Sequence, residues 1–143
     1  MKKIMHFLST RDMFARHTGI ELLDIGPGWA KVSMKIEPHH FNAAKTVHGG
    51  AIFTLADFAF AAASNSHGTL AMGINTSISF VKAATSGTLY AEAREQTRNR
   101  TLASYSVQIT DDANDVVAVF QGMVYRKNEP IISPDGTLYE NTK

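Results

Sequence analysis

An almost uncharged stretch in the middle of the chain restricts the folds that this protein can adopt. From Thr46 to Val81 the only formally charged side chain is Asp57, although 19% of the whole chain is charged, a fraction that would supply about seven charges here. Residues 51–66 lack glycine and proline and are rich in alanine, leucine and phenylalanine, which predicts a helix over residues 50–65. The longest apolar part of this stretch, residues 51–64, contains an acid and is too short to span a bilayer, so we expect the helix to be buried inside a soluble domain.

Periodic patterns on both sides of this helix predict further elements. Residues 4–17 have apolar side chains at roughly helical spacing before Gly19, and residues 20–25 and 29–36 form a strand hairpin around Gly26-Pro27-Gly28. Four more strands, expected to form an antiparallel meander, follow at residues 70–81, 88–98, 102–110 and 116–126. Because strands joined by hairpins need no helical crossovers, this order predicts an α+β fold whose sheet wraps the central helix.

Length and composition indicate a single domain over residues 1–143. The chain can bury one core but is too short for two ordinary domains, and residues 128–143 are expected to be loosely packed or to lie across a neighbouring surface. The net charge of +1 comes from 14 basic and 13 acidic residues mixed along the chain, so we expect no nucleic-acid partner. The lack of cysteine excludes disulfides and thiolate chemistry, and with no export signal recognised we expect the protein in the cytoplasm, without a membrane anchor.

Asp57 is the first candidate for chemistry, because it is the one acid on an apolar helix. Burying an unpaired carboxylate costs several kcal/mol and raises its pKa. A structural role, in which the carboxylate binds backbone amides or a partner hydroxyl, therefore needs a specific hydrogen-bond partner. The same surroundings suit a general base or a nucleophile, and this is the interpretation that we favour.

The segment His48-Gly49-Gly50 precedes the helix and is the second candidate. At a helix N-terminus the backbone N–H groups lack partners and can polarise a carbonyl oxygen, although two glycines alone indicate no more than a turn. Along an α-helix Gly49 and Asp57 are about 12 Å apart, too far to act on one carbonyl group. We therefore expect a site in a homodimer, where Gly49 of one chain faces Asp57 of the other.

The six histidines do not predict a metal site. The adjacent side chains of His39 and His40 are expected to diverge, and neither has the helix-spaced partner that is typical of zinc sites. His48 is expected to orient its loop by hydrogen bonding or to contact the substrate. Since the chain contains no G-x-S-x-G segment, a serine triad is also unsupported.

A longer pattern resembles a known family. The segments Phe41-Asn42, 47–57 and 63–66 strongly resemble the PaaI-like hotdog thioesterases, the phenylacetyl-CoA thioesterase group: they combine an asparagine six positions before the histidine, the HGG turn, Leu-Ala-Asp and a helix that ends in Ser-Asn-Ser. The resemblance continues to about Arg126. It implies a hotdog fold, homodimers that pair further into homotetramers, and hydrolysis of acyl-CoA to free acid and coenzyme A, with no cofactor besides the coenzyme A of the substrate.

The resemblance also assigns roles to individual residues. Asp57 acts as general base or nucleophile, the Gly49 N–H polarises the thioester carbonyl, and Asn42 positions water or substrate. Asn42 has the weakest physical support, because a loop asparagine commonly bonds to its own backbone. The residues expected to bind the substrate or its coenzyme A are His48, Gly50, Asn75, Thr76, Ser77, Val81, Lys82, Arg98 and Arg100.

Three further questions stay open at the level of sequence. Phe58 could shape the acyl pocket or fill the core, so phenylacetyl, hydroxylated aryl and short or medium acyl groups all remain candidates. Asn99 occupies a turn position where the family often has glycine, which leaves the contact with the coenzyme A phosphates undefined. A hotdog dehydratase or hydratase, and a hotdog that binds acyl-CoA without turnover, are the alternative functions.

Overall fold

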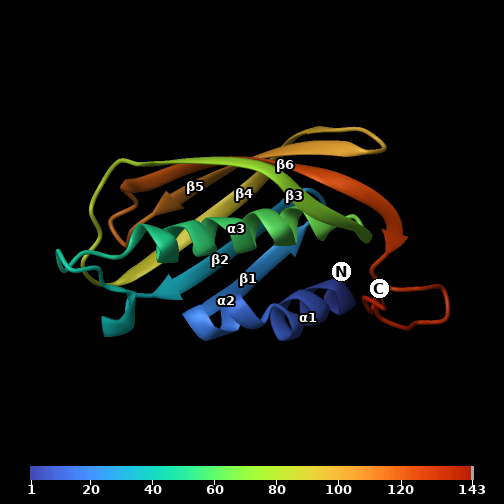
Figure 1. Cartoon of the computed structure of the whole chain (residues 1–143), viewed down its shortest axis with the longest axis horizontal. Coiled ribbons are helices and arrows are strands. Elements are labelled where there is room, and N and C mark those ends of the chain that lie inside the picture. The colour runs from blue at the N-terminus through green and yellow to red at the C-terminus, as the bar shows by residue number, and fades with distance from the viewer. Residues whose placement is uncertain (143) are drawn as a thin grey trace.

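The computed structural model describes residues 1–142 and consists of helices on one side of a six-stranded antiparallel sheet (Figure 1). The helices are α1 Lys2–Arg11, α2 Met13–Thr18 and α3 Gly49–Asn65, with a 3-10 turn at Pro38–His40. The strands are β1 Ile20–Gly26, β2 Trp29–Lys35, β3 Thr69–Phe80, β4 Thr88–Arg98, β5 Leu102–Thr110 and β6 Val116–Pro130. The predicted α+β architecture, with a sheet around one central helix, is confirmed.

The core lies between α3 and the concave face of the sheet. Leu55, Ala56 and Ala59 of α3 are fully buried, and Phe60 packs its ring against Phe120 of β6 with 5.5 Å between ring centroids. Small residues on α3 allow the strands to approach the helix closely, and the sheet curves along it (Figure 1). The helix is therefore buried along most of its circumference.

The order of the strands differs from the predicted meander. Of the four strands expected in the meander, only β4, β5 and β6 follow one another in the sheet, whose order is β1-β2-β4-β5-β6-β3. The prediction was wrong for β3, because α3 carries the chain across the concave face and delivers β3 to the far edge, beside β6 (Figure 1). Residues 81–87 then return the chain to β4, which pairs with β2. As a result, one long side of β3 has no strand partner among the described residues.

The segment expected to form one leading helix is broken at Asp12. Asp12 has an extended backbone (φ −81°, ψ 90°), and its carboxylate accepts a hydrogen bond of 3.0 Å from the Ala15 N–H. An aspartate that caps a helix in this way starts a new helix instead of continuing the previous one. Gly19 ends α2 in the left-handed conformation, as predicted.

The first part of the tail is more tightly packed than expected. Ile131 is fully buried, and its N–H donates to the carbonyl of Gly68 at 2.9 Å. Ile132 and Leu138 then form a backbone bridge, and Arg11 of α1 donates to the carbonyl of Tyr139 at 3.4 Å. The tail therefore lies against its own chain, near the N-terminal helices. No helix among the described residues is long and apolar enough to cross a membrane.

The contact between Phe60 and β6 leads to a prediction about stability. A Cβ atom on Gly122 would lie 2.7 Å from the Phe60 Cζ, and Phe60 is buried on all sides. Gly122→Ala should therefore lower the free energy of unfolding by about 1–3 kcal/mol, which urea denaturation measures. Gly26→Ala is the matched control, because its nearest neighbour, the Trp29 ring, is 3.8 Å away. Equal unfolding midpoints for the two variants would contradict the proposed packing constraint.

Candidate active site

One stripe of α3 is left uncovered by the sheet. Gly50, Thr54, Asp57 and Ala61 recur at helical spacing and are exposed or half-buried, whereas from Leu55 to Asn65 the other residues of α3 are buried. The four side chains are small except for the carboxylate. This stripe is where a ligand or a second chain can reach the helix.

Asp57 differs from its prediction in its exposure. In the single chain its side chain is exposed, because the carboxylate lies on the uncovered stripe and not in the core. Even so, partial burial raises the pKa of Asp57 above its ordinary value of 3.8, and the negative charge of Asp12 raises it further. The carboxylate is therefore open to water and at the same time partly desolvated by the protein around it. Asp57 is also not alone, since Asp12 shares its surroundings.

Asp12 was missed in the sequence because it lies 45 positions before Asp57 and resembles any helix-capping residue. Its half-buried carboxylate is held by the α2 cap, on elements that pack against α3. The break between α1 and α2 thus places a second negative charge near Asp57. The only available signal was the pattern of a capping residue inside an otherwise helical stretch.

The start of α3 has the geometry of a carbonyl-binding site. His48 caps the helix, and its Nδ1 accepts the Gly50 N–H at 2.8 Å, which confirms that His48 orders this turn. The Gly49 N–H has no hydrogen-bond partner in residues 1–142. A Cβ atom on Gly49 would lie 3.1 Å from the Phe80 ring, so the position is closely packed on the β3 side. The free N–H can donate to an incoming oxygen.

Asn42 is occupied within its own loop. Its Oδ1 accepts the N–H groups of Ala44 at 2.9 Å and Thr46 at 3.2 Å, and its Nδ2 donates to the Thr46 hydroxyl at 3.0 Å. This is the structural role that loop asparagines commonly have. One N–H of the amide group remains for a substrate.

The predicted channel residues of β3 lie on different faces of the strand. Thr76 pairs with Gly122, which approaches Phe60, so Thr76 shares the face of α3. Asn75 and Ser77 lie on the opposite face, where both line a hollow of about 530 Å³ on the outside of the sheet. A second outer hollow, of about 660 Å³, is lined by Ser77, Glu92, Arg94 and Gln121 among others, and it is likewise separated from Asp57 by the sheet.

Of the last two residues predicted to line the channel, Val81 and Lys82, only Lys82 is engaged in side-chain contacts within the chain. Val81 is exposed, but the ammonium group of Lys82 donates to Asp111 at 2.6 Å and to Asp115 at 2.8 Å, and both carboxylates raise the pKa of Lys82. Lys82 therefore holds the β5–β6 turn. Phe58 is buried, so the question left open by the sequence is answered: its ring fills the core.

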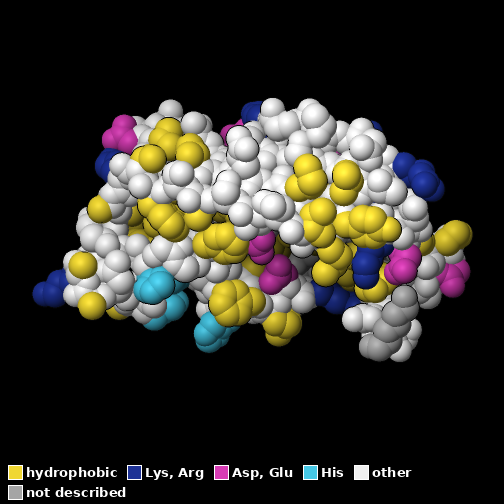
Figure 2. Space-filling view, turned by 45° about the horizontal axis from the view of Figure 1, so that its top comes forward, with side chains coloured by type: hydrophobic (Ala, Val, Ile, Leu, Met, Phe, Trp, Pro, Cys, Tyr) yellow, Lys and Arg dark blue, Asp and Glu magenta, His cyan; other side chains and the backbone are white. Residues whose placement is uncertain are grey.

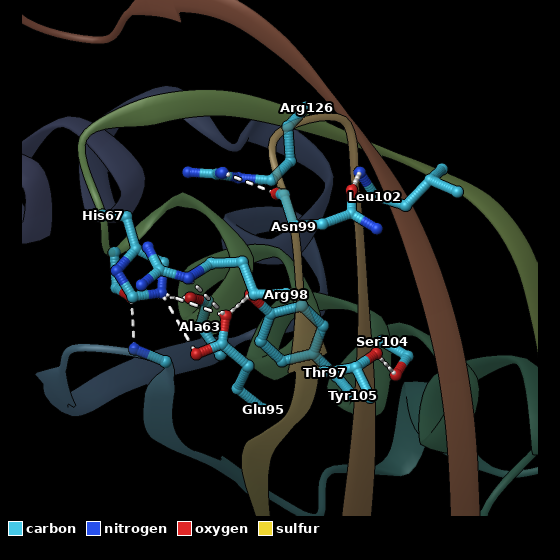
Figure 3. A network of polar contacts seen from close by, with 12 residues as sticks. Ala63, His67, Glu95, Thr97, Arg98, Asn99, Leu102, Ser104, Tyr105 and Arg126 are labelled. Carbon is cyan, nitrogen blue, oxygen red and sulfur yellow. Dashed lines mark hydrogen bonds and ion pairs between the residues drawn. The ribbon is translucent and has the colours of Figure 1, made fainter.

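The predicted cations Arg98 and Arg100 lie at the turn between β4 and β5, and Figure 3 shows Arg98 with its neighbours. Arg98 has its Nε 3.4 Å from a Glu95 oxygen, which also accepts bonds from His67 at 3.1 Å and Tyr105 at 3.0 Å. Burial raises the pKa of the Tyr105 hydroxyl, and the charge of Glu95 adds to this effect. Arg100 is exposed and makes no ion pair within the described part of the chain.

The same turn contains a third cation that the sequence did not bring forward. Arg126 of β6 donates to the Asn99 carbonyl at 2.9 Å, and the Asn99 side chain accepts the N–H groups of Thr101 and Leu102. Asn99 thus closes the turn through its side chain, without the positive φ that a glycine would supply there. Arg126 joins the turn only through strand pairing, which no local pattern reveals.

The histidine pair also differs from expectation. The rings of His39 and His40 do not diverge but lie 4.2 Å apart between centroids. His40 is buried, with Nε2 2.6 Å from the Thr18 carbonyl and Nδ1 accepting the Glu37 N–H at 3.0 Å. His40 therefore fixes the 3-10 turn to α2. In residues 1–142 no three His, Cys, Asp or Glu residues are grouped so that they could hold a metal ion.

Comparisons with known proteins identify the family. Residues 44–118, just over half of the chain, match the family model of the thioesterase superfamily. A protein from Archaeoglobus fulgidus is 41% identical over 130 residues, which cover 90% of this chain and 84% of that protein. The acyl-coenzyme A thioesterase PaaI from Escherichia coli is 32% identical over 122 residues, covering 85% of this chain and 87% of PaaI.

Solved structures agree with this assignment. The structure of E. coli PaaI, from the phenylacetic acid degradation operon, has a TM-score of 0.87 at 30% identity, over 90% of this chain and 94% of that one. The smu.793 protein from Streptococcus mutans, bound to acetyl CoA, has a TM-score of 0.74 at 25% identity, over 78% of this chain and 90% of that one. The chain therefore belongs to the thioesterase superfamily and is a thioester hydrolase with a hotdog fold.

Proposed function

We propose that this enzyme hydrolyses small acyl-CoA thioesters at a site formed by two chains, with Asp57 of one chain opposite Gly49 of the other. The observation that carries the proposal is the pairing of a free N–H at the start of α3 with a carboxylate of raised pKa on the uncovered stripe. An oxyanion donor and a base are the two groups that thioester hydrolysis requires. The acetyl CoA bound to the S. mutans relative supports a CoA ester as ligand.

Two chains are needed because the Gly49 N–H and the Asp57 carboxylate of one chain lie too far apart along α3 to act on the same carbonyl group. Gly49 and Asp57 are eight residues apart on α3, a rise of about 12 Å. The open edge strand β3 supports a second copy, since it exposes Met72, Ile74 and Phe80. Pairing two such edges around a two-fold axis would bring the uncovered stripes of both α3 helices together. A homotetramer, formed from two such dimers, is the assembly that we propose on the basis of the resemblance.

The mechanism assigns one task to each group. The Gly49 N–H donates to the thioester carbonyl oxygen as negative charge develops on it. Asp57 either removes a proton from the attacking water or attacks the carbonyl carbon itself, forming a mixed anhydride that water then cleaves. In both routes the C–S bond breaks, coenzyme A leaves as the thiolate and takes up a proton, and the free acid is released. The raised pKa makes Asp57 a stronger base than an ordinary aspartate.

The remaining contacts complete the proposal. The free N–H of Asn42 is available to the water or the substrate, His48 and Gly50 shape the turn around the carbonyl, and Thr76 lies on the α3 side of β3. Arg100 is the better candidate for the coenzyme A phosphates, because Glu95 already pairs with Arg98. We propose no cofactor apart from the coenzyme A of the substrate itself.

The first prediction concerns Asp57 and tests the function directly. A thiol-release assay over acetyl-, butyryl-, decanoyl- and phenylacetyl-CoA should detect free coenzyme A with the wild type, and Asp57→Asn should lower kcat by about 100-fold or more. Binding of the esters without release would instead identify a binding protein, and near-normal turnover by the variant would remove Asp57 from the mechanism.

The same variant should be more stable at neutral pH. The carboxyl group titrates at 3.8 in the unfolded chain and at a higher pH in the folded protein, so the wild type loses stability as the pH rises through the folded pKa. Asp57→Asn should therefore have a higher Tm than the wild type at pH 7, with a difference that shrinks toward pH 3. Thermal scans across this range provide the measurement.

A second prediction concerns Asp12. Asp12→Asn keeps the α2 cap, because asparagine caps helices as well as aspartate does, but it removes the charge that raises the pKa of Asp57. The acidic limb of the pH profile of kcat/KM should move to lower pH, since Asp57 then stays ionised in more acidic solution. Asp24→Asn, which removes an exposed carboxylate that does not act on the pKa of Asp57, is the control and should leave the profile unchanged. A profile unchanged in Asp12→Asn would show that the two charges do not interact.

A third prediction tests the two-chain site. Gly49→Pro removes the N–H at the first residue of the helix, where proline is common, after His48 with φ −58° and ψ 136°. The exposed Phe80 ring must move slightly to admit the new Cβ atom. Homodimers of Gly49→Pro and of Asp57→Asn should both be inactive. Heterodimers purified through two different tags should regain about half of the wild-type turnover, because one of their two sites is intact. If each site lay within one chain, the heterodimer would be as inactive as its parents.

A further inference from the structure

A small pocket adjoins the uncovered stripe at the start of α3. Three elements contribute to it: α2, the 3-10 turn with its following residue, and the first two turns of α3. Its volume is about 240 Å³, and the side chains that define its character are Phe14, His17, His39, Phe41, His48 and Thr54. Histidine side chains (cyan) lie beside hydrophobic ones (yellow) on this part of the surface (Figure 2).

The lining of this pocket suits an uncharged, compact group. No Asp, Glu, Lys or Arg side chain lines it in the described part of the chain, and its walls are phenyl rings, imidazole rings and two threonine side chains. Its volume is below the range of about 300–1000 Å³ that is typical of sites for drug-sized ligands. The main polar groups are already engaged: His48 caps α3, His40 bonds to Thr18, and Thr54 donates to the Gly50 carbonyl.

The pocket lies next to Gly49, whose backbone N–H is proposed to bind the thioester carbonyl opposite Asp57 of the other chain. His48 and Gly50, which line the pocket, flank Gly49. On the β3 side, Gly49 meets the Phe80 ring. A carbonyl bound to the Gly49 N–H therefore has β3 on one side and the pocket of α2 on the other.

Resting on the function proposed above, we propose that Phe14 and His17 of α2 form the outer wall of the acyl pocket and set the upper size of the acyl group. The coenzyme A arm then lies on the β3 side, and the acyl group extends toward α2. Phe14 contributes to this wall as an exposed ring, 66% accessible, so it is not part of the hydrophobic core. The buried residues of α2 are Ala15 and Thr18, whereas Phe14 and His17 are exposed, so these two side chains can be replaced without changing the buried side of α2.

Met13 provides a matched control on the same helix. It is as exposed as Phe14, at 66%, and is its neighbour in the chain, but it does not line the pocket. The experiment compares wild type, Phe14→Ala, Phe14→Ala with His17→Ala, and Met13→Ala. It measures kcat/KM for butyryl-CoA and decanoyl-CoA, with the Tm of each variant as a check on folding.

The proposal predicts a change in the ratio of the two rate constants. Phe14→Ala should raise kcat/KM for decanoyl-CoA relative to butyryl-CoA by about tenfold, and the double variant should raise it further, because each extra methylene that a pocket accepts is worth 10-fold or more. The Tm should stay within a few degrees of the wild type, and Met13→Ala should keep the wild-type ratio. An unchanged or lower ratio in Phe14→Ala, or an equal change in Met13→Ala, overturns the proposal while leaving hydrolysis itself intact. Failure of the wild type to release thiol from either ester would instead overturn the proposed function.

Discussion

The close contact between α3 and the two strands at one edge of the sheet determines the rest of this structure. Phe60 packs against β3 and β6 where both strands carry a glycine, Gly73 and Gly122, and a Cβ at either position would lie within 3.1 Å of its ring. This contact sets how far the sheet curves around the helix. It also fixes which side of α3 stays open, because the face opposite the sheet carries Asp57.

The relation between helix and sheet explains why a polar residue occurs in an otherwise apolar segment. Most of the circumference of α3 is needed for the core, which demands alanine, leucine and phenylalanine. The remaining stripe, which carries Asp57, is exposed or half-buried in the single chain. A carboxylate there keeps part of its hydration and still has a raised pKa, a combination that suits a base which must react with water.

Local patterns were sufficient for most elements but not for their arrangement. The boundaries of α3 and β4 follow from periodicity and turn residues, because these depend on neighbours in the sequence. The place of β3 beside β6 depends on pairing between distant segments, and the meander prediction failed there. The break between α1 and α2 was missed because it depends on a single capping hydrogen bond, from the Ala15 N–H to the Asp12 carboxylate. Asp57 was predicted to be buried, although small or polar residues at Gly50, Thr54 and Ala61 already marked an open stripe.

For the candidate site, too, the sequence predicted what depends on neighbouring residues and missed what depends on the arrangement of distant segments. Gly49 and Asp57 lie on one helix that His48 caps, so a local motif could bring the three residues forward as candidates. The residues contributed by other elements were harder to foresee. Ser77 faces the outside of the sheet and Lys82 binds two aspartates, while Phe14 and Arg126 reach their sites only through the fold.

The turn between β1 and β2 is subject to two separate restrictions. Gly28 has a φ of +70°, and a Cβ atom there would lie 2.6 Å from a carboxylate oxygen of Glu95, the residue that His67, Tyr105 and Arg98 share. A smaller residue at position 95 would relieve the steric restriction but not the torsional one. Replacement of Gly28 is therefore restricted both by its backbone torsion angle and by the contact with Glu95. Replacement of Glu95 would in turn leave three donors without their common acceptor.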